Sequence, residues 1–404
     1  MKRKPLSIIP AVILTVVCVS TGTFAQQGTD VNESTAEAVN SEGSTGFDNL
    51  IELKNGNSLR YTGSMELLYA DQFSVDYYER GYKYIEIEPD QKILMVPQGY
   101  EVPENLNLDI TVIYQIPEHI YLAASASFDF FRKLGSVGNI TLSSQKVSGW
   151  YIPEAIDAME KGEMLYAGKY SAPDYELILS EGCDLAIENM MISHQPEVKE
   201  KLEALGIPVI IERASYEAEP LGRMEWIRFY GALLNKEEEA ETYFNEISQK
   251  VESVRNQEST GLSTAFFSIT TTGAVTVRKS GDYIARSIEM AGGKYVTLDE
   301  SDEENALSTM TVQMEAFYAA AKNADILIYN STIEGEIQTI DQLVEKSSLL
   351  KDFKAVNEGR VWCVEKNLYQ EPLELGEMIL DINKILHDPD TPDDRLYFLH
   401  RLYS

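Results

Sequence analysis

The chain has 404 residues, of which 34 are basic and 65 acidic, so its formal net charge is −31. This acidic excess argues against a nucleic-acid-binding protein, because such proteins carry basic patches that meet the phosphate backbone. The length exceeds the roughly 250–300 residues at which a single hydrophobic core stops growing, and it therefore predicts two lobes or domains.

The first 25 residues have the pattern of a signal peptide. A basic start at Lys2–Lys4 precedes a mostly apolar stretch from Leu6 to Val19, and Thr23–Ala25 then offers small residues at the positions that a signal peptidase reads. The apolar stretch is shorter than the ~20 residues of a transmembrane helix. We therefore expect residues 1–25 to be removed and the protein to be extracytoplasmic, at the cell surface, in a periplasm or secreted.

Cys18 and the polar segment after the apolar stretch bear on how the protein is attached to the membrane. Cys18 lies near the end of the apolar stretch, as in bacterial lipoproteins. However, Val17 stands where their processing site has Gly, Ala or Ser, so the sequence does not decide whether Cys18 carries a lipid anchor. Residues 26–46 are polar and are expected to form a flexible linker. Cys183 and Cys363 lie beside or within apolar runs and are expected to be buried free thiols.

Short strand patterns separated by turn residues fill the segment from Phe47 to about Gln115. Turns are indicated by Asn-Gly, Pro-Asp-Gln and Pro-Gln-Gly sequences. The expected strands are Arg60–Tyr61, Leu67–Tyr69, Tyr82–Ile87 and Ile93–Val96. We interpret residues 47–115 as a β-rich flap attached to the first lobe.

From Ile120 onward, strand and helix patterns alternate. Strands are expected at 120–124, 139–142, 185–188 and 208–211, with a short strand that Tyr170 closes. Helices are expected at 128–134, 151–161, 173–181 and 196–205. Such alternation with helices of about ten residues predicts an α/β fold with a mostly parallel sheet that is covered on both faces.

Two consecutive helix patterns, 221–234 and 236–255, interrupt this alternation, which then resumes. The later strands are expected at 264–269, 326–329 and 361–364, and the later helices at 282–290, 314–322, 340–345 and 373–386. We therefore predict two α/β lobes linked by a single long helix. The predicted boundaries are 47–218 for the N-terminal lobe with its flap, 219–235 for the interlobe helix and 236–404 for the C-terminal lobe.

A weak internal similarity relates the two lobes. Glu176 begins a helix that leads to Asp184 and an apolar strand, and Glu315 begins a helix that leads to Asp325 and another apolar strand. Two lobes of similar plan would present these glutamates at equivalent places. A solvated helix position is the alternative explanation for each of them.

Three stretches resemble the class of ABC importer substrate-binding proteins that carry iron-siderophores, cobalamin and haem. They are IYLAASASFDFFRKLG from Ile120, YSAPDYELILSEGCDLAI from Tyr170 and YEAEPLGRMEWIRFYGALLNKEEEA from Tyr216. The segment RKSGDYIARSIEMAGG from Arg278 is similar to the opening of the second lobe in this class. The resemblance covers roughly residues 120–387 and implies two lobes joined by a rigid helix, with the ligand in the cleft between them.

Matching positions one by one gives candidate ligand-binding residues, each with a structural alternative. In the first lobe Tyr170 is an aromatic candidate, Asn189 and Met190 end a strand that should face the cleft, and Ser125 and Ser127 lie where a strand meets a helix N-terminus. Such an N-terminus suits an anionic group of a ligand. Packing or helix capping would explain the same residues without a ligand.

In the second lobe the resemblance indicates Arg278, Tyr283 and Tyr369 as ligand-binding candidates. An arginine there could meet a carboxylate or a catecholate oxygen, and Tyr369 would oppose Tyr170 across the cleft. The resemblance also implies that Glu176 and Glu315 dock on arginines of the two permease subunits.

The sequence therefore predicts the substrate-binding component of an ABC importer, which takes up an iron-siderophore or a similar metal chelate. The expected partners are the chelate, the permease and its ATPase. We expect a monomer that has no cofactor, no resident metal and no nucleic-acid partner, and that meets the membrane only through its tether or the permease. The sequence leaves haem and cobalamin open as ligands.

Other classes of protein fit the sequence less well. The four histidines and the lack of HExxH, GxSxG, P-loop and CxxC motifs disfavour an enzyme. A receptor for bare Zn²⁺ or Mn²⁺ would need several histidines at the cleft, where only His194 is a candidate. A surface interaction protein that works without a transporter is an alternative that the sequence does not exclude.

Overall fold

The computed structural model describes residues 50–52, 58–104, 106–107, 109–298 and 309–403. The predicted signal peptide with Cys18 and the predicted linker lie outside these residues. The described part contains three sheets of at least five strands and one two-stranded hairpin. None of the described helices is both long enough and apolar enough to span a bilayer.

The first sheet is six-stranded and forms the flap, defined here as residues 50–114. Its neighbouring strands are antiparallel, except that the last two run parallel. In order, the strands are β1 (Leu50–Glu52), β2 (Ser58–Ser64), β3 (Phe73–Tyr78), β4 (Lys83–Ile87), β5 (Gln91–Val96) and β6 (Ile110–Tyr114). The predicted β-rich flap is therefore present, and it contains more strands than the turn signals indicated.

The flap packs against the rest of the chain through an aromatic cluster and through two hydrogen bonds between a side-chain amide and the backbone. The ring of Phe73 lies 4.9 Å from that of Trp226 and 5.7 Å from that of Phe229, measured between centroids. The side-chain amide of Gln91 donates to the carbonyl of Ile211 at 2.8 Å and accepts from the N–H of Ile211 at 2.7 Å. Buried aromatic contacts and satisfied backbone groups fix the flap in place.

The prediction of a strand at Leu67–Tyr69 is wrong, because a buried carboxylate accepts hydrogen bonds from the backbone N–H groups of this segment. The side chain of Glu225 accepts hydrogen bonds from the N–H groups of Leu68 (2.9 Å), Tyr69 (2.7 Å) and Ala70 (2.8 Å). Backbone donors that a side chain satisfies need no partner strand. The segment is therefore a loop that binds Glu225 of α5 (Pro220–Leu234).

The first lobe, defined here as residues 120–211, is built on a five-stranded parallel sheet in the order β13-β12-β7-β8-β9. Its strands are β7 (Ile120–Leu122), β8 (Ile140–Ser143), β9 (Leu165–Tyr166), β12 (Leu185–Glu188) and β13 (Val209–Ile211). Its helices are α1 (Phe128–Lys133), α2 (Pro153–Glu160), α3 (Tyr175–Ser180) and α4 (Pro196–Ala204). The expected alternation is confirmed, with boundaries that differ by a few residues.

Glu188, the last residue of β12, is a buried acid within the first lobe. It has 0% exposure, and neither carboxyl oxygen has a hydrogen-bond partner among the described residues. Burial in an apolar environment disfavours the charged form and raises the pKa of Glu188 to about 8. The folded state therefore holds this proton between pH 4.5 and 8, whereas the unfolded chain releases it.

We expect Glu188→Gln to be more stable than the wild type above pH 8 and to differ little from it near pH 4. Because the folded state binds the extra proton, the free energy of unfolding of the wild type falls as pH rises through this range. Each unit of pKa shift corresponds to about 1.4 kcal/mol, so the gain at pH 9 should reach a few kcal/mol. Urea unfolding of both proteins from pH 4 to 9 measures it; parallel pH profiles would contradict the assignment.

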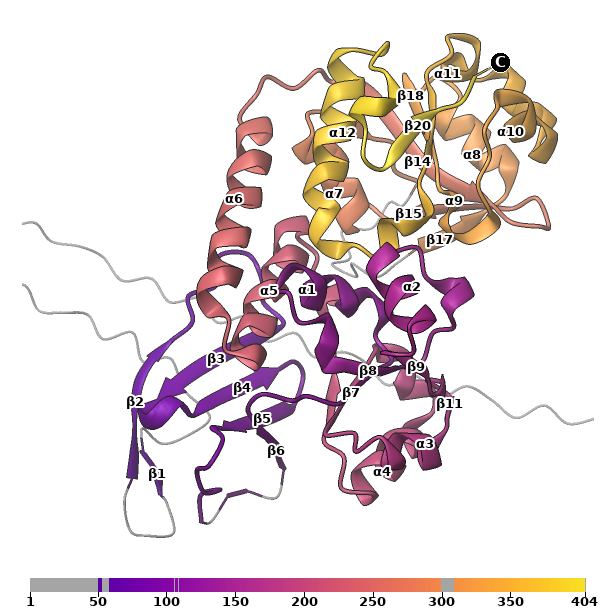
Figure 1. Ribbon diagram of the computed structural model, residues 1–404. Helices are drawn as coiled ribbons and strands as arrows, with labels where there is room; N and C mark the ends of the chain where they lie inside the picture. The colour runs from indigo at the N-terminus through magenta and orange to yellow at the C-terminus, as the bar shows by residue number, and fades with distance from the viewer. Residues whose placement is uncertain (1–49, 53–57, 105, 108, 299–308, 404) are drawn as a thin grey trace, which may run out of the picture. The chain divides into compact units, whose positions relative to one another are not determined.

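Two helices carry the chain from β13 to the second lobe: α5, followed by α6 (Glu237–Arg255) (Figure 1). All residues of α5 except Arg223 are buried, as expected for a helix that is apolar on most sides and is packed all round. Asn235 ends α5 in the left-handed conformation with φ of 55°. Both predicted helices are confirmed.

The second lobe, defined here as residues 263–403, has a seven-stranded mixed sheet in the order β17-β15-β14-β18-β19-β20, with β16 beside β14. Strands β14, β16, β18 and β19 are parallel, whereas β15, β17 and β20 are antiparallel to their neighbours. The strands are β14 (Ser263–Ile269), β15 (Val275–Arg278), β16 (Lys294–Tyr295), β17 (Thr309–Val312), β18 (Ile326–Tyr329), β19 (Val361–Val364) and β20 (Leu399–Arg401).

The helices of the second lobe follow the predicted alternation. They are α7 (Tyr283–Met290), α8 (Met314–Ala321), α9 (Ser331–Glu334), α10 (Ile340–Lys346), α11 (Lys354–Asn357) and α12 (Leu375–His387). The helix predicted at 373–386 begins instead with a 3-10 turn, Pro372–Glu374, before α12.

The internal similarity has a structural basis at its two aspartates. Asp184 accepts from the N–H groups of Glu118 (2.8 Å) and His119 (3.1 Å), which lead into β7. Asp325 accepts in the same way from the N–H of Ser263 (2.8 Å), at the start of β14. In each lobe, therefore, an aspartate before one parallel strand satisfies the backbone at the entrance of the neighbouring strand.

Candidate functional site

A pocket of about 280 Å³ lies between the two lobes and α5. The first lobe, the loop after it, α5 and the second lobe all contribute lining residues. The lining residues are Ala126, Phe130, Glu212, Ala214, Ser215, Arg223, Arg278, Asp282, Tyr283, Leu368, Tyr369, Pro372 and Leu375. An interlobe crevice at the carboxyl ends of parallel strands is a favoured place for a ligand.

Arg278, at the end of β15, is held in place by groups of the second lobe. Its Nη1 lies 3.3 Å from Oδ2 of Asp282, and its Nη2 donates to the hydroxyl of Tyr369. The hydroxyl of Tyr369 also accepts from the side-chain amide of Asn330 at 3.0 Å. The side chain of Arg278 is 14% exposed, and these contacts fix the direction of its guanidinium before any ligand arrives.

A second guanidinium faces the same pocket from α5. The guanidinium carbon of Arg223 lies 3.6 Å from the ring centroid of Tyr283, whereas that of Arg278 lies 5.7 Å from the same centroid. Nε of Arg223 donates to the carbonyl of Glu217 at 3.0 Å. Burial disfavours the charged form and lowers the pKa of Arg223. Arginines pair readily with planar anionic groups.

Two acids balance part of this positive charge. Asp282 is 1% exposed and caps α7 by accepting from the N–H of Ile284 at 2.9 Å. Glu212 is 5% exposed and accepts from the N–H of Ala214 at 2.7 Å. Burial raises the pKa of Asp282, and it raises the pKa of Glu212 to about 7. Below neutral pH, Glu212 is therefore protonated and the pocket is net positive.

The candidate residues of the second lobe converge on this pocket. Arg278, Tyr283 and Tyr369 all line it. In the first lobe Ser125 and Ser127 flank the lining residue Ala126; Ser127 is fully buried and its hydroxyl does not cap α1. The structure thus brings the second-lobe candidates together, with the two serines beside them.

Three other candidates of the first lobe lie outside the pocket lining. Tyr170 occupies the turn between β10 (Gly168–Lys169) and β11 (Ala172–Pro173), and it packs on the apolar core of the first lobe. Asn189 accepts from the N–H of Met191 at 2.9 Å, which is a capping contact. The sulfur of Met190 lies 3.6 Å from Nη1 of Arg213.

The two docking candidates occupy equivalent positions. Glu176 is the second residue of α3 and Glu315 the second residue of α8, and each of these helices precedes a parallel strand in its own lobe. Both glutamates are exposed. The equivalence inferred from the sequence is present in the fold.

Sequence reasoning missed Arg223, Glu212 and Asp282. Arg223 is one of three charged residues, with Glu225 and Arg228, in a mostly apolar helix pattern, and these interruptions were the available signal. Asp282 precedes a helix and looks like an ordinary N-cap. Glu212 follows an apolar strand, at the edge where ligands of parallel sheets bind.

The described residues offer one group with metal-ligand chemistry, and it lies apart from the pocket lining. Atoms of Glu336, Glu365 and His400 lie within 4.8 Å of one another. His400 contacts Oε1 of Glu365 through Nδ1 at 2.7 Å and the carbonyl of Ile337 through Nε2 at 2.9 Å. An ion pair explains this geometry. No histidine is among the described residues that line the pocket.

The chain matches one known protein family over more than half of its length. The model of the periplasmic binding protein family matches residues 123–368, which is more than half of the chain. The chain belongs to this family. Members of the periplasmic binding protein family bind solutes. The matched segment includes the pocket-lining residues from Ala126 to Leu368 and ends before Tyr369, Pro372 and Leu375.

The chain is also similar to individual proteins of known sequence or structure. An uncharacterized lipoprotein of Methanocaldococcus jannaschii is 24% identical over 408 residues, which cover 95% of this chain and 93% of the relative. The periplasmic haem-binding protein HutB of Vibrio cholerae has a TM-score of 0.53 and 13% identity, over 65% of this chain and 96% of HutB. The petrobactin-binding protein YclQ of Bacillus subtilis has a TM-score of 0.53 and 14% identity, over 68% of this chain and 94% of YclQ. The two solved structures share the fold.

Proposed function

We propose that this periplasmic binding protein captures an anionic metal chelate, such as an iron-siderophore, and delivers it to an ABC importer. The observation that carries the proposal is the convergence of Arg223 and Arg278 with two tyrosine rings in one interlobe pocket. Guanidinium groups at a partly buried site form strong, directional hydrogen bonds to carboxylate or catecholate oxygens. The ring of Tyr369 lies in the lining and offers an aromatic surface to the organic part of a chelate. The ring of Tyr283 packs against the guanidinium of Arg223 and holds this cation at the pocket.

The size of the pocket limits the way in which the ligand sits. About 280 Å³ is at the small end of ligand sites. We expect a large chelate to place one anionic arm on the arginines and to extend out of the opening. Ser125, Tyr170, Asn189 and Met190 are proposed contacts of such an extended ligand. Haem stays a second candidate, because both haem-binding and siderophore-binding proteins share this fold.

Arg278→Ala should weaken binding of the recognised chelate by about tenfold or more, which corresponds to ~1.4 kcal/mol. The variant removes a preformed cation from a buried site, while the lining of the pocket loses little packing. Calorimetric titration with a ferric tris-catecholate, a ferric hydroxamate, haem and cobalamin measures the effect. Arg255→Ala is the control, since Arg255 is 54% exposed on α6 and pairs with Glu252.

Two results would count against the proposal. Equal affinity of the wild type and Arg278→Ala for the chelate that binds would place the ligand elsewhere. Binding of bare Zn²⁺ or Mn²⁺, with no chelate bound, would favour a metal-ion receptor instead.

We also propose that the protein acts outside the cytoplasm as a monomer, tethered or free, and that it is not an enzyme. The lipoprotein name of the Methanocaldococcus jannaschii relative supports a lipid anchor at Cys18. Electrospray mass measurement of the mature chain distinguishes a lipidated start at Cys18 from cleavage after Ala25.

A further inference from the structure

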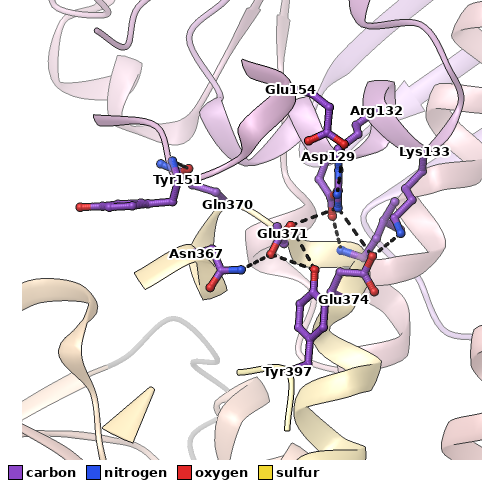
Figure 2. A network of polar contacts seen from close by, with 11 residues as sticks. Asp129, Arg132, Lys133, Tyr151, Glu154, Asn367, Gln370, Glu371, Glu374 and Tyr397 are labelled. Atoms are coloured by element: carbon purple, nitrogen blue, oxygen red, sulfur yellow. Dashed lines mark hydrogen bonds and ion pairs between the residues drawn. The ribbon is translucent and has the colours of Figure 1, made fainter. Parts of the chain in front are cut away.

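A network of charged groups joins the two lobes beside the pocket (Figure 2). Arg132 of α1, in the first lobe, lies at its centre. Its Nε and Nη2 donate to Oδ1 of Asp129 at 2.9 and 2.5 Å. The same Nη2 lies 3.2 Å from Oε1 of Glu371 and 3.6 Å from Oε1 of Glu374, both in the second lobe. One guanidinium thus contacts acids of both lobes.

Two further contacts of the network cross between the lobes. Lys133 pairs with Glu374, and Oδ2 of Asp129 accepts from the backbone N–H of Leu373 at 3.0 Å. The first lobe supplies both cations, whereas the second lobe supplies Glu371 and Glu374. This opposite charge gives the contact a preferred register, because a shift of one lobe would separate the pairs.

The network is desolvated, so its groups depend on one another. The side chain of Arg132 is 15% exposed, that of Glu371 4% and that of Asp129 0%. Burial raises the pKa of Asp129 to about 7 in spite of the neighbouring arginine. If Arg132 were removed, Asp129 and Glu371 would be left buried without their shared cation, which is much more costly than the loss of a surface pair.

Neutral contacts on the same side fix the second-lobe segment further. The side chain of Gln370 accepts from the N–H of Tyr151 at 2.8 Å and donates to the carbonyl of Gly149 at 2.7 Å. Within the second lobe, Asn367 and Tyr397 donate to the carboxylate of Glu371. Glu371 therefore faces Arg132 in a fixed direction, as Figure 2 shows.

The segments that make this network are also walls of the pocket. Phe130 lines the pocket and lies two residues before Arg132 in α1. In the second lobe, Tyr369, Pro372 and Leu375 line the pocket and alternate along the chain with Gln370, Glu371, Leu373 and Glu374. The spacing of the two pocket walls is therefore fixed by the same residues that join the lobes.

We propose that Arg132 and Lys133, with Glu371 and Glu374, form an interlobe latch that positions the pocket wall Tyr369–Leu375 and retains a bound ligand. Arg132 is a positioning residue, since it acts on the ligand through Tyr369 and its neighbours. The part that concerns retention rests on the proposed function, whereas the positioning of the wall does not. An intact latch slows ligand release, because the walls must separate before the ligand leaves.

Hydrogen exchange on the ligand-free protein tests the positioning directly. We expect amide exchange in the segment 368–376, including Leu373, to become at least tenfold faster in Arg132→Ala, while exchange in the flap stays unchanged. Arg132→Lys should restore part of the protection, since it keeps the charge but loses the forked contact. Arg255→Ala is the matched control, because it removes an exposed arginine of α6.

A second variant keeps the test decisive if Arg132→Ala fails to fold. Glu371→Gln removes one of the two second-lobe charges, leaves Glu374 and α1 unchanged, and should increase exchange in the same segment. Unchanged exchange in 368–376 in both variants would overturn the latch. Acceleration spread equally over the whole chain would overturn it as well, since that outcome indicates general destabilisation.

Ligand release is measured with a ferric tris-catecholate as the probe. We expect Arg132→Ala to release it at least tenfold faster with a nearly unchanged association rate, as effects on a formed complex act mainly on dissociation. Unchanged release from a variant with faster exchange would overturn retention. If the wild type does not bind the probe, a ferric tris-catecholate is excluded as its ligand, and the exchange result alone decides whether the latch positions the wall.

Discussion

Uptake through the cognate permease should fall to background when Glu176 and Glu315 are both replaced by alanine, while chelate affinity stays unchanged. Both residues are exposed in the first turn of a helix, one in each lobe, and neither lines the pocket. In the resembling class, such glutamates meet arginines of two permease subunits. If the two glutamates dock as proposed, their removal weakens the complex with the permease and leaves the pocket intact. Whole-cell uptake and calorimetry of the purified variant measure the two quantities.

The control for this experiment has the same charge change at comparable helix positions. Glu197 of α4 and Asp341 of α10 are exposed acids in the first turn of a helix, again one in each lobe. The variant with alanine at both positions should transport normally. Normal transport by the Glu176, Glu315 variant would remove these residues from the docking role.

The largest expected loss of stability follows from Glu225→Ala. Glu225 has 0% exposure, accepts three backbone N–H bonds from the loop at Leu68–Ala70, and pairs with Nη1 of Arg228 at 3.1 Å. The variant leaves these donors without an acceptor and removes one of the two carboxylate partners of the buried Arg228, the other being Glu241 at 2.7 Å. Breaking a buried charge pair costs about 3–5 kcal/mol, and we expect a loss in the free energy of unfolding of that size. Urea denaturation measures it.

Two further variants separate the role of this carboxylate from general packing. Glu225→Gln keeps an acceptor of the same shape and should lose less stability than alanine. Glu252→Ala removes an acid of α6 that is 33% exposed and pairs with Arg255, and it should change stability by less than about 1 kcal/mol. A loss below about 1 kcal/mol in Glu225→Ala would show that the loop does not depend on this carboxylate.

Elements with strong local patterns could be predicted from the sequence. The strand Leu185–Glu188 has the bounds that its apolar run indicated, and the amphipathic helix patterns at 221–234 and 236–255 both form helices with nearly the expected ends. In these segments local preference and tertiary burial agree. The two-lobed α/β fold followed from their alternation.

Elements that depend on distant partners could not be predicted in this way. Leu67–Tyr69 has a strand-like sequence but forms a loop, because Glu225, about 155 residues later, binds its N–H groups. The edge strand Leu399–Arg401 was missed because its short sequence is defined only by pairing with β19. Such contacts leave no local periodicity in the sequence.

The candidate site was predicted in part. The resemblance indicated Arg278, Tyr283 and Tyr369, which line one pocket. It did not indicate Arg223, because the charged residues of α5 interrupt the apolar pattern without showing which of them faces the pocket. The interlobe contacts of Arg132 were also hidden, since they join residues about 240 positions apart.

Native mass spectrometry of the protein purified from its own host, together with an absorbance scan of the same sample, shows directly whether the protein carries a chelate. We expect a single chain carrying one small anionic chelate, with an absorbance band of an iron chelate, and we expect Arg278→Ala purified in parallel to carry much less of it. A wild-type chain that carries only bare metal ions, or a variant without Arg278 that carries the chelate equally well, would contradict the proposed function.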